Sequence, residues 1–247
     1  MKMARATSYV KFNLEKLPSL TGFEKIELLR DMHQCRMTSE SFKVYDTCYK
    51  NDLIDRLKYI DHHNMFHLLI KEPKKYKNNI LQVWQLMQVH YKPSVHLYQE
   101  MIRCCQTWND LQLASQLIER LKEQKLTPTT AILNSILKLS SSSIQSTQDA
   151  LKYYDEIKDV VQPDWITFCR LMELQALIYN PPACHRLYST AMRTCIPSWR
   201  GGLKKKPLKM HQQAIVDQLT MSYLSALVNS RESPNLIMNT YNRIDWD

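Results

Sequence analysis

The feature that most constrains this chain is a set of prolines at a regular interval. Pro93, Pro128 and Pro163 stand 35 residues apart, and Pro197 follows 34 residues later. Between successive prolines the apolar residues fall twice into helical spacing, with a polar break between the two runs. A fixed period of about 20–50 residues is the sequence signature of stacked repeats. The spacing therefore predicts a repeated pair of helices.

The second helix of each predicted pair carries one shared apolar stripe. A small or apolar residue is followed by two spacers, an apolar pair, two more spacers and a last apolar residue. Such a stripe is the helix face that buries against neighbouring helices. Its repetition in phase with the prolines predicts that each pair packs on the next. The stripes run from Ile80 to Met87, Ala114 to Leu121, Ala150 to Ile157 and Cys184 to Ala191.

Composition restricts the fold class to all-α. The only glycines are Gly22, Gly201 and Gly202, which argues against sandwiches, barrels and the glycine loops that cradle phosphates. A hydrophobic fraction of 44% with 23% charged residues is ordinary for a globular protein. No apolar run is long enough to span a membrane. We expect a right-handed α-solenoid of stacked helix-turn-helix repeats.

Charge and cysteine content indicate the partner and the compartment. The formal net charge of +9 suits a polyanionic partner, although Lys-rich solvated faces would give the same balance. Seven cysteines with no CxxC pair predict free thiols in a reducing compartment.

The chain divides into four predicted segments. The first is basic and is interpreted either as a solvated arm or as a transit segment, which would place the protein in the mitochondrion rather than the cytoplasm. The third contains five basic residues, interpreted as a solvated loop or as a contact for phosphates. The segments are an arm over 1–22, helical repeats over 23–198 (irregular to about 59, regular over 60–198), a basic loop over 199–214 and a C-terminal helical repeat over 215–247.

The prolines close each unit within a short motif. The motifs are Lys92-Pro93-Ser94, Thr127-Pro128-Thr129 and Gln162-Pro163-Asp164, and the helices that follow carry the large residues Tyr98, Leu133 and Phe168. With the segment 110–128, they resemble the pentatricopeptide repeat family over 60–198 and 215–247, and weakly over 23–59. The chain departs from that family where its turn glycines are replaced, by Asn109, Ser142 and Asn180.

The resemblance implies a scaffold that reads single-stranded RNA with one base per unit. Reading falls to the residue after the large one and to the residue that closes the unit. The implied pairs are Asn64 with Ser94, Gln99 with Thr129, Asn134 with Asp164, and Cys169 with Ser198. The family uses Asn with Asp for uracil, whereas Cys is a weak hydrogen bonder suited to packing alone. The residues implied to brace the bases are His96, Ala131 and Ile166.

Simpler roles exist for these residues. Asn134 would serve as an exposed polar residue, and Asp164 as a helix N-cap, a role compatible with reading. Arg103 and Lys138 recur at one offset in consecutive units. They are expected to meet phosphates, or else to lie on a solvated face.

Nothing in the sequence predicts catalysis or a cofactor. His62, His63 and His67 suggest a metal, but zinc needs three or four ligands and no partner motif accompanies them. We therefore expect a non-catalytic, single-stranded RNA-binding protein of organellar RNA processing or translation, with the ribosome or RNA-processing proteins as further partners. The alternative is a tetratricopeptide-like solenoid that scaffolds a protein complex. The Leu-Gly pair typical of that repeat is absent.

Overall fold

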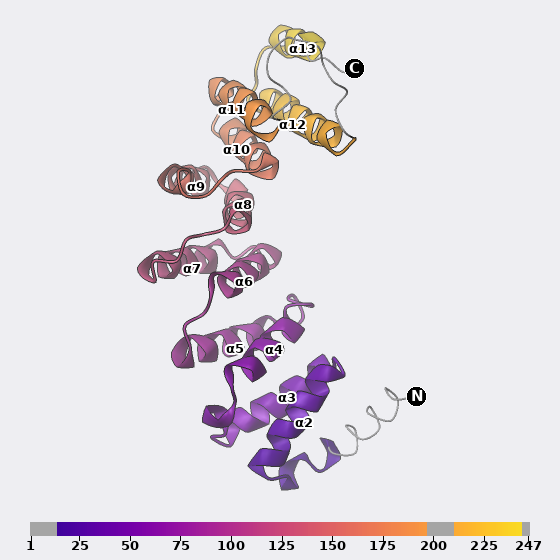
Figure 1. The fold of residues 1–247 in the computed structure, drawn as a ribbon. Helices are drawn as coiled ribbons and strands as arrows, with labels where there is room; N and C mark the ends of the chain where they lie inside the picture. The colour runs from indigo at the N-terminus through magenta and orange to yellow at the C-terminus, as the bar shows by residue number, and fades with distance from the viewer. Residues whose placement is uncertain (1–13, 197–209, 244–247) are drawn as a thin grey trace. The chain divides into compact units, whose positions relative to one another are not determined.

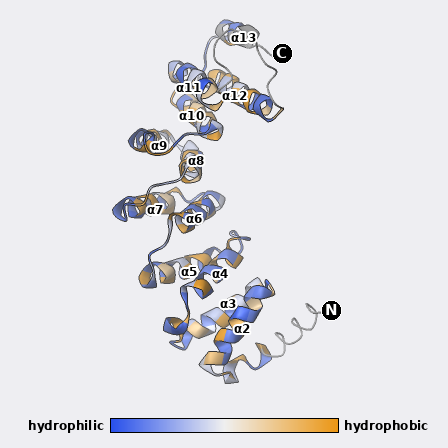
Figure 2. Cartoon of the chain, in the orientation of Figure 1, coloured by the Kyte–Doolittle hydropathy of each residue, from blue (hydrophilic) through white to orange (hydrophobic). Residues whose placement is uncertain are grey.

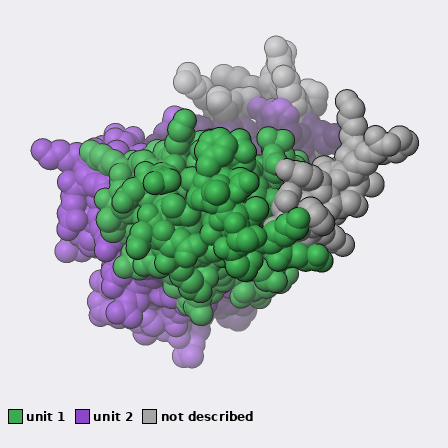
Figure 3. Space-filling model, turned by 90° about the horizontal axis from the view of Figure 1, so that it is seen from below, with its two compact units in different colours: residues 1–94 green, residues 95–247 purple. Residues whose placement is uncertain are grey.

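The computed structural model describes residues 14–196 and 210–243, and the regular structure in these ranges is entirely helical. This confirms the all-α prediction. The chain forms two compact units, unit 1 over residues 1–94 and unit 2 over residues 95–247 (Figure 3). The boundary between the units, at Ser94 and Val95, falls within the stretch 60–198 that is expected to hold regular repeats.

Unit 1 is built from two helical pairs. The first helices α2 and α4 contact each other, and each packs on its own second helix, α3 or α5. The core between them contains Leu29, Met32, Tyr45 and Phe66, all fully buried. The helices are α2 (Gly22–Gln34), α3 (Thr38–Lys50), α4 (Tyr59–Leu69) and α5 (Lys77–His90), with short 3₁₀ turns at Leu17–Ser19 and Ile54–Arg56.

Unit 2 continues the pattern with a chain of contacting first helices. Along it α6 contacts α8, α8 contacts α10 and α10 contacts α12. Helix α12 begins at Met210, within the stretch 199–214 expected as a loop, whose residues 199–209 lie outside the described ranges. The helices are α6 (Val95–Trp108), α7 (Leu111–Glu123), α8 (Thr130–Leu139), α9 (Ile144–Ile157), α10 (Trp165–Leu177), α11 (Pro181–Cys195), α12 (Met210–Asn229) and α13 (Pro234–Arg243), labelled in Figure 1.

The predicted stripes on the second helices form much of the core. On α7 the whole stripe is buried, from Ala114 through Leu117 and Ile118 to Leu121. Figure 2 shows how apolar and polar residues alternate around such helices. Fully burying a Leu or Ile side chain stabilises a fold by about 1.5–3 kcal/mol, so stacking the pairs supplies the main driving force. In the described residues no helix is long and apolar enough to cross a membrane.

Six helix ends in the described ranges share one turn that does not use glycine. At the end of α7, for example, Lys125 N–H donates to Lys122 O (2.9 Å) and Leu126 N–H donates to Leu121 O (3.0 Å). This pair of bonds closes a helix around one left-handed residue. Glycine normally fills that position, because a left-handed backbone costs other residues free energy. The left-handed residues are Arg36, Asp52, Asn109, Lys125, Tyr179 and Arg231.

Candidate nucleic-acid interface

The first bonded pair joins α6 to the start of α8. The Thr129 hydroxyl donates to Gln99 Oε1 at 2.9 Å, across 30 residues of sequence. The same hydroxyl accepts the Ile132 N–H at 3.3 Å, which makes Thr129 the N-cap of α8. The Thr129 side chain therefore caps α8 and also binds its predicted partner Gln99 on α6, the preceding first helix.

The second bonded pair joins α8 to the start of α10 at the same separation. Asn134 Nδ2 donates to Asp164 Oδ1 at 3.1 Å and Oδ2 at 3.3 Å. Asp164 Oδ1 also accepts the Thr167 N–H at 2.8 Å and caps α10. The capping role and the contact with Asn134 thus occur together. The two pairs place a half-buried amide and its partner at equivalent positions of consecutive units.

The other two implied pairs are not equivalent to these. Asn64 is half-buried in α4 and Ser94 is exposed just before α6, both in unit 1. Ser198 lies outside the described residues. Its implied partner Cys169 is only 6% exposed and belongs to the core packed around α12, where burial raises the pKa of its thiol. Its burial fits the packing role that the sequence suggests for a cysteine at this position.

The expected bracing residues lie on the first turns of their helices. His96 on α6 and Ala131 on α8 are exposed, so both are accessible to a base. Ile166 on α10 is half-buried and offers a smaller apolar surface.

The two cations at equivalent offsets differ in their surroundings. Arg103 Nη1 pairs with both carboxylate oxygens of Glu100, at 3.0 and 3.1 Å. A phosphate would have to compete with that carboxylate for Arg103. Lys138 is exposed near the end of α8, and the structure gives its ammonium no ion-pair partner among the described residues. Lys138 is therefore the more available of the two for a phosphate.

Sequence reasoning missed three contacts that link first helices. The Thr167 hydroxyl donates to Asn134 Oδ1 at 2.7 Å, and Gln106 Nε2 donates to the Ser135 carbonyl at 3.1 Å. In unit 1, Arg30 on α2 forms two hydrogen bonds with Asp61 on α4, at 2.9 and 2.8 Å. A polar residue in the first turn of the following helix was the only sequence signal for Thr167 and Asp61.

The histidine cluster of unit 1 belongs to its packing. His62 Nδ1 lies 2.6 Å from the Tyr45 hydroxyl, and His63 Nε2 lies 3.1 Å from His67 Nε2. Burial, with a smaller contribution from His90, lowers the pKa of His62 to about 4. Within the described ranges, three or more His, Cys, Asp or Glu side chains do not gather as a metal site would require.

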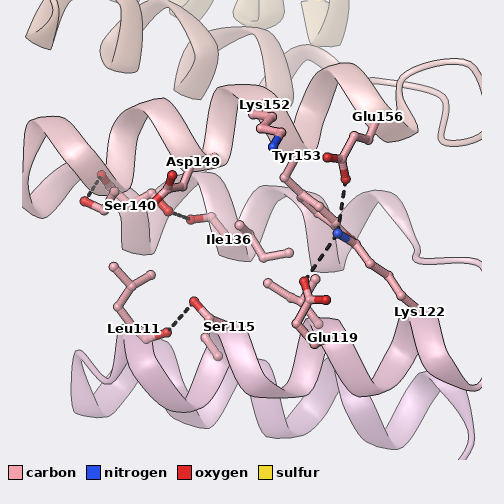
Figure 4. Close-up of a pocket in the computed structure, with 14 residues that line it drawn as sticks. Leu111, Ser115, Glu119, Lys122, Ile136, Ser140, Asp149, Lys152, Tyr153 and Glu156 are labelled. Atoms are coloured by element: carbon pink, nitrogen blue, oxygen red, sulfur yellow. Dashed lines mark hydrogen bonds and ion pairs between the residues drawn. The ribbon is translucent and has the colours of Figure 1, made fainter.

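Each unit also has a cavity near these helices. In unit 1 a cavity of about 430 Å³ is lined by residues of α2 and α4, including His33 and Asn64. In unit 2 a cavity of about 320 Å³ lies on the second-helix side, between α7 and α9. Figure 4 shows Lys122 bridging it through ion pairs with Glu119 and Glu156. None of the implied reading residues lines the cavity of unit 2.

The stacked pairs and the bonded positions between them define a helical-repeat protein. Residues 67–142 match the family model described as the pentatricopeptide repeat domain. The resemblance found in the sequence is thereby confirmed over these residues.

Solved structures of one such protein are similar to the chain at low identity. The crystal structure of the pentatricopeptide repeat protein PPR10 in complex with an 18-nucleotide psaJ RNA element is 15% identical, with a TM-score of 0.44, over 95% of this chain and 39% of that one. The structure of PPR10 from maize is 15% identical, with a TM-score of 0.40, over 95% and 38%. The chain thus spans about two fifths of the proteins it matches. No curated protein matches it.

Proposed function

We propose that this chain binds single-stranded RNA without catalysis, through the first helices of unit 2. The observation that carries the proposal is the recurrence of a half-buried amide bonded to a capping side chain 30 residues later. Repeats of this kind read one base per unit with two or three side chains. Gln99 with Thr129 and Asn134 with Asp164 would be two successive reading positions.

The surrounding residues support a nucleic-acid ligand. His96 and Ala131 are exposed beside the two amides, where a base would stack, and Lys138 is exposed one turn further along α8. The net charge of +9 favours a polyanion. Each engaged base contributes roughly 1–3 kcal/mol, so two complete positions predict weak to moderate affinity with a loose sequence preference.

The cellular role follows as part of the same proposal. Binding without catalysis would shield, position or recruit a transcript during RNA processing or translation in the mitochondrion. The basic residues Arg200, Lys204, Lys205, Lys206 and Lys209 would add contacts to the ribosome or to other RNA. A C-terminal fluorescent fusion, imaged with a mitochondrial marker, tests the compartment. Diffuse cytoplasmic signal would contradict it.

Titration of the purified chain with labelled oligonucleotides tests the binding itself. Fluorescence anisotropy with oligo-U, oligo-A and duplex RNA at two salt concentrations should show binding to single strands that weakens with salt. Asn134→Ala should lower the preference for oligo-U. Gln116→Ala, which removes an exposed amide from α7, should leave it unchanged. Failure to bind any single strand at low salt would overturn the proposal and favour the protein-binding scaffold.

A further inference from the structure

The orientation of the Asn134 amide is fixed by chemistry. An ionised carboxylate only accepts hydrogen bonds, so the amide atom facing both oxygens of Asp164 must be the nitrogen. The amide oxygen then points the other way, where it lies 2.7 Å from the Thr167 hydroxyl. Turning the amide over would set oxygen against carboxylate and leave Thr167 facing a donor.

The single proton of the Thr167 hydroxyl is directed to this amide oxygen. The hydroxyl accepts the Asp164 N–H at 3.2 Å and lies 2.9 Å from Asp164 Oδ1. That carboxylate oxygen already accepts the Thr167 N–H and one hydrogen of Asn134 Nδ2. The Asn134 oxygen is closer, at 2.7 Å, and Thr167 is fully buried, so water does not replace the bond.

Asn134 is left as a donor. Its oxygen is occupied by Thr167, and one N–H shared between the two oxygens of Asp164 leaves the second N–H for a ligand. Uracil and guanine carry a carbonyl oxygen at the position where cytosine and adenine carry an amino group. A hydrogen-bond donor at this point therefore favours uracil and guanine and disfavours cytosine and adenine.

We propose that Thr167 is a positioning residue that sets the base preference of this site. Resting on the proposed function, the inference adds that the buried hydroxyl of the next unit holds Asn134 with its N–H toward the base. Without it, the carboxylate alone still attracts the nitrogen, but the oxygen is free to accept from an amino group. Thr167 thus sharpens the discrimination of uracil from cytosine.

The preceding unit provides an internal comparison. There the equivalent first-turn position is Ile132, which has no hydroxyl, and the partner of Gln99 is the Thr129 hydroxyl. A hydroxyl both donates and accepts, so it bonds either end of an amide. The orientation of the Gln99 amide is therefore not forced. We expect this position to discriminate less between bases with carbonyl and amino groups.

Two substitutions at Thr167 separate the hydroxyl from the shape of the side chain. Thr167→Val keeps the branched shape, and Thr167→Ser keeps the hydroxyl. Anisotropy titrations with oligo-U and oligo-C should give the wild type a preference for oligo-U of about fivefold or more. The Val variant should bring the ratio to about twofold by improving oligo-C binding, and the Ser variant should restore it. An unchanged ratio in the Val variant, folded by circular dichroism, would overturn the inference.

A measurement without RNA distinguishes this inference from the proposed function. With isotopically labelled asparagine, the Asn134 side-chain amide should give a protected NMR signal in the wild type and in Thr167→Ser. Its hydrogen exchange should become several-fold faster in Thr167→Val, because the bond that holds the oxygen is lost. Equal exchange in all three proteins would show that Thr167 does not hold the amide. A wild type that binds no oligonucleotide would overturn the proposed function instead.

Discussion

Two contacts between neighbouring first helices join residues at nearly the same separation in sequence, but they serve different purposes. In unit 2, Asn134 on α8 bonds Asp164 at the start of α10, and both side chains are half-buried. In unit 1, Arg30 on α2 bonds Asp61 in the first turn of α4, whose side chain is 1% exposed. The first contact leaves the Asn134 amide partly exposed to solvent, whereas the second buries the Asp61 carboxylate inside the unit.

The difference shows how a contact between neighbouring first helices acquires different roles. In both contacts the carboxylate also accepts a backbone N–H at the start of its own helix. Asp61, in the first turn of α4, accepts the N–H of the N-cap residue Lys58, and Asp164, the N-cap of α10, accepts the N–H of Thr167. A neutral amide as partner keeps hydrogen-bonding capacity for a ligand. A guanidinium as partner donates two hydrogen bonds to the carboxylate and fixes the packing of the two helices. Unit 1 therefore uses its contact for packing, whereas the contact in unit 2 keeps the capacity that the proposed function requires.

The largest expected effect is acid unfolding of unit 1. Burial lowers the pKa of His33 and of His62 to about 4, from 6.5. The unfolded chain therefore binds more protons between pH 6.5 and pH 4, and stability falls as the pH drops through that window, by up to about 3 kcal/mol for each histidine. Urea unfolding at a series of pH values measures the slope. His33→Gln with His62→Gln should flatten it, whereas the exposed His211→Gln should not.

Next in size is the loss of the buried carboxylate. Asp61→Ala should lower the free energy of unfolding by about 2–3 kcal/mol, near the bottom of the range for a buried pair because Arg30 is 40% exposed and can turn to water. Asp46→Ala removes a half-buried carboxylate whose partner Lys50 is 70% exposed, and should cost less, about 0.5 kcal/mol. Equal losses in urea unfolding would mean that unit 1 does not depend on the sealed contact.

A smaller effect separates capping from reading at Asp164. Asp164→Ala removes the N-cap of α10 and should cost about 1 kcal/mol of stability. Asp164→Ser keeps a capping oxygen, so its stability should change by less than about 0.5 kcal/mol. Both should lose the preference for oligo-U, because neither side chain forces the Asn134 nitrogen toward it. Thermal melts and anisotropy titrations together measure this, and a Ser variant that keeps the preference would reduce Asp164 to a cap.

The smallest effect concerns the exposed cations. Lys138→Ala should weaken binding to every single strand alike, and should reduce the slope of log affinity against log salt by about 0.7, the value for one phosphate contact. Lys152→Ala removes the same charge from the exposed surface of α9, on the second-helix side, and serves as the control. Identical slopes for the two variants would place Lys138 on a solvated face.

The sequence predicts the scaffold well because its signals are periodic. The stripe from Ala114 to Leu121 is buried as expected, since helix packing in a repeat depends on local spacing. The family resemblance also pairs Asn134 with Asp164 as reading residues, and the structure bonds the two side chains directly. Their role in reading a base stays a prediction.

The rest depends on contacts that no single helix encodes. Cys169 occupies a reading offset, and its residue type favours packing, but nothing in its own unit shows that the core it joins includes Leu219 and Tyr223 of α12. Thr167 looks like an ordinary first-turn threonine until Asn134 of the preceding unit reaches it. The Arg30–Asp61 pair falls in the irregular part of the sequence, where the repeat gave no register for matching residues between helices.

Replacing the left-handed residues at the glycine-free helix ends with glycine should raise the melting temperature. Each left-handed residue, such as Lys125, carries a backbone penalty of about 1–2 kcal/mol that glycine would remove, against about 0.5–1 kcal/mol for the freer unfolded chain. Glycine scanning over the six positions should therefore yield small gains that add, except at Tyr179 and Arg231, whose side chains form a cation–π contact at 5.3 Å. None of the six substitutions changes Gln99, Thr129, Asn134 or Asp164, so the side chains of the two bonded pairs are kept.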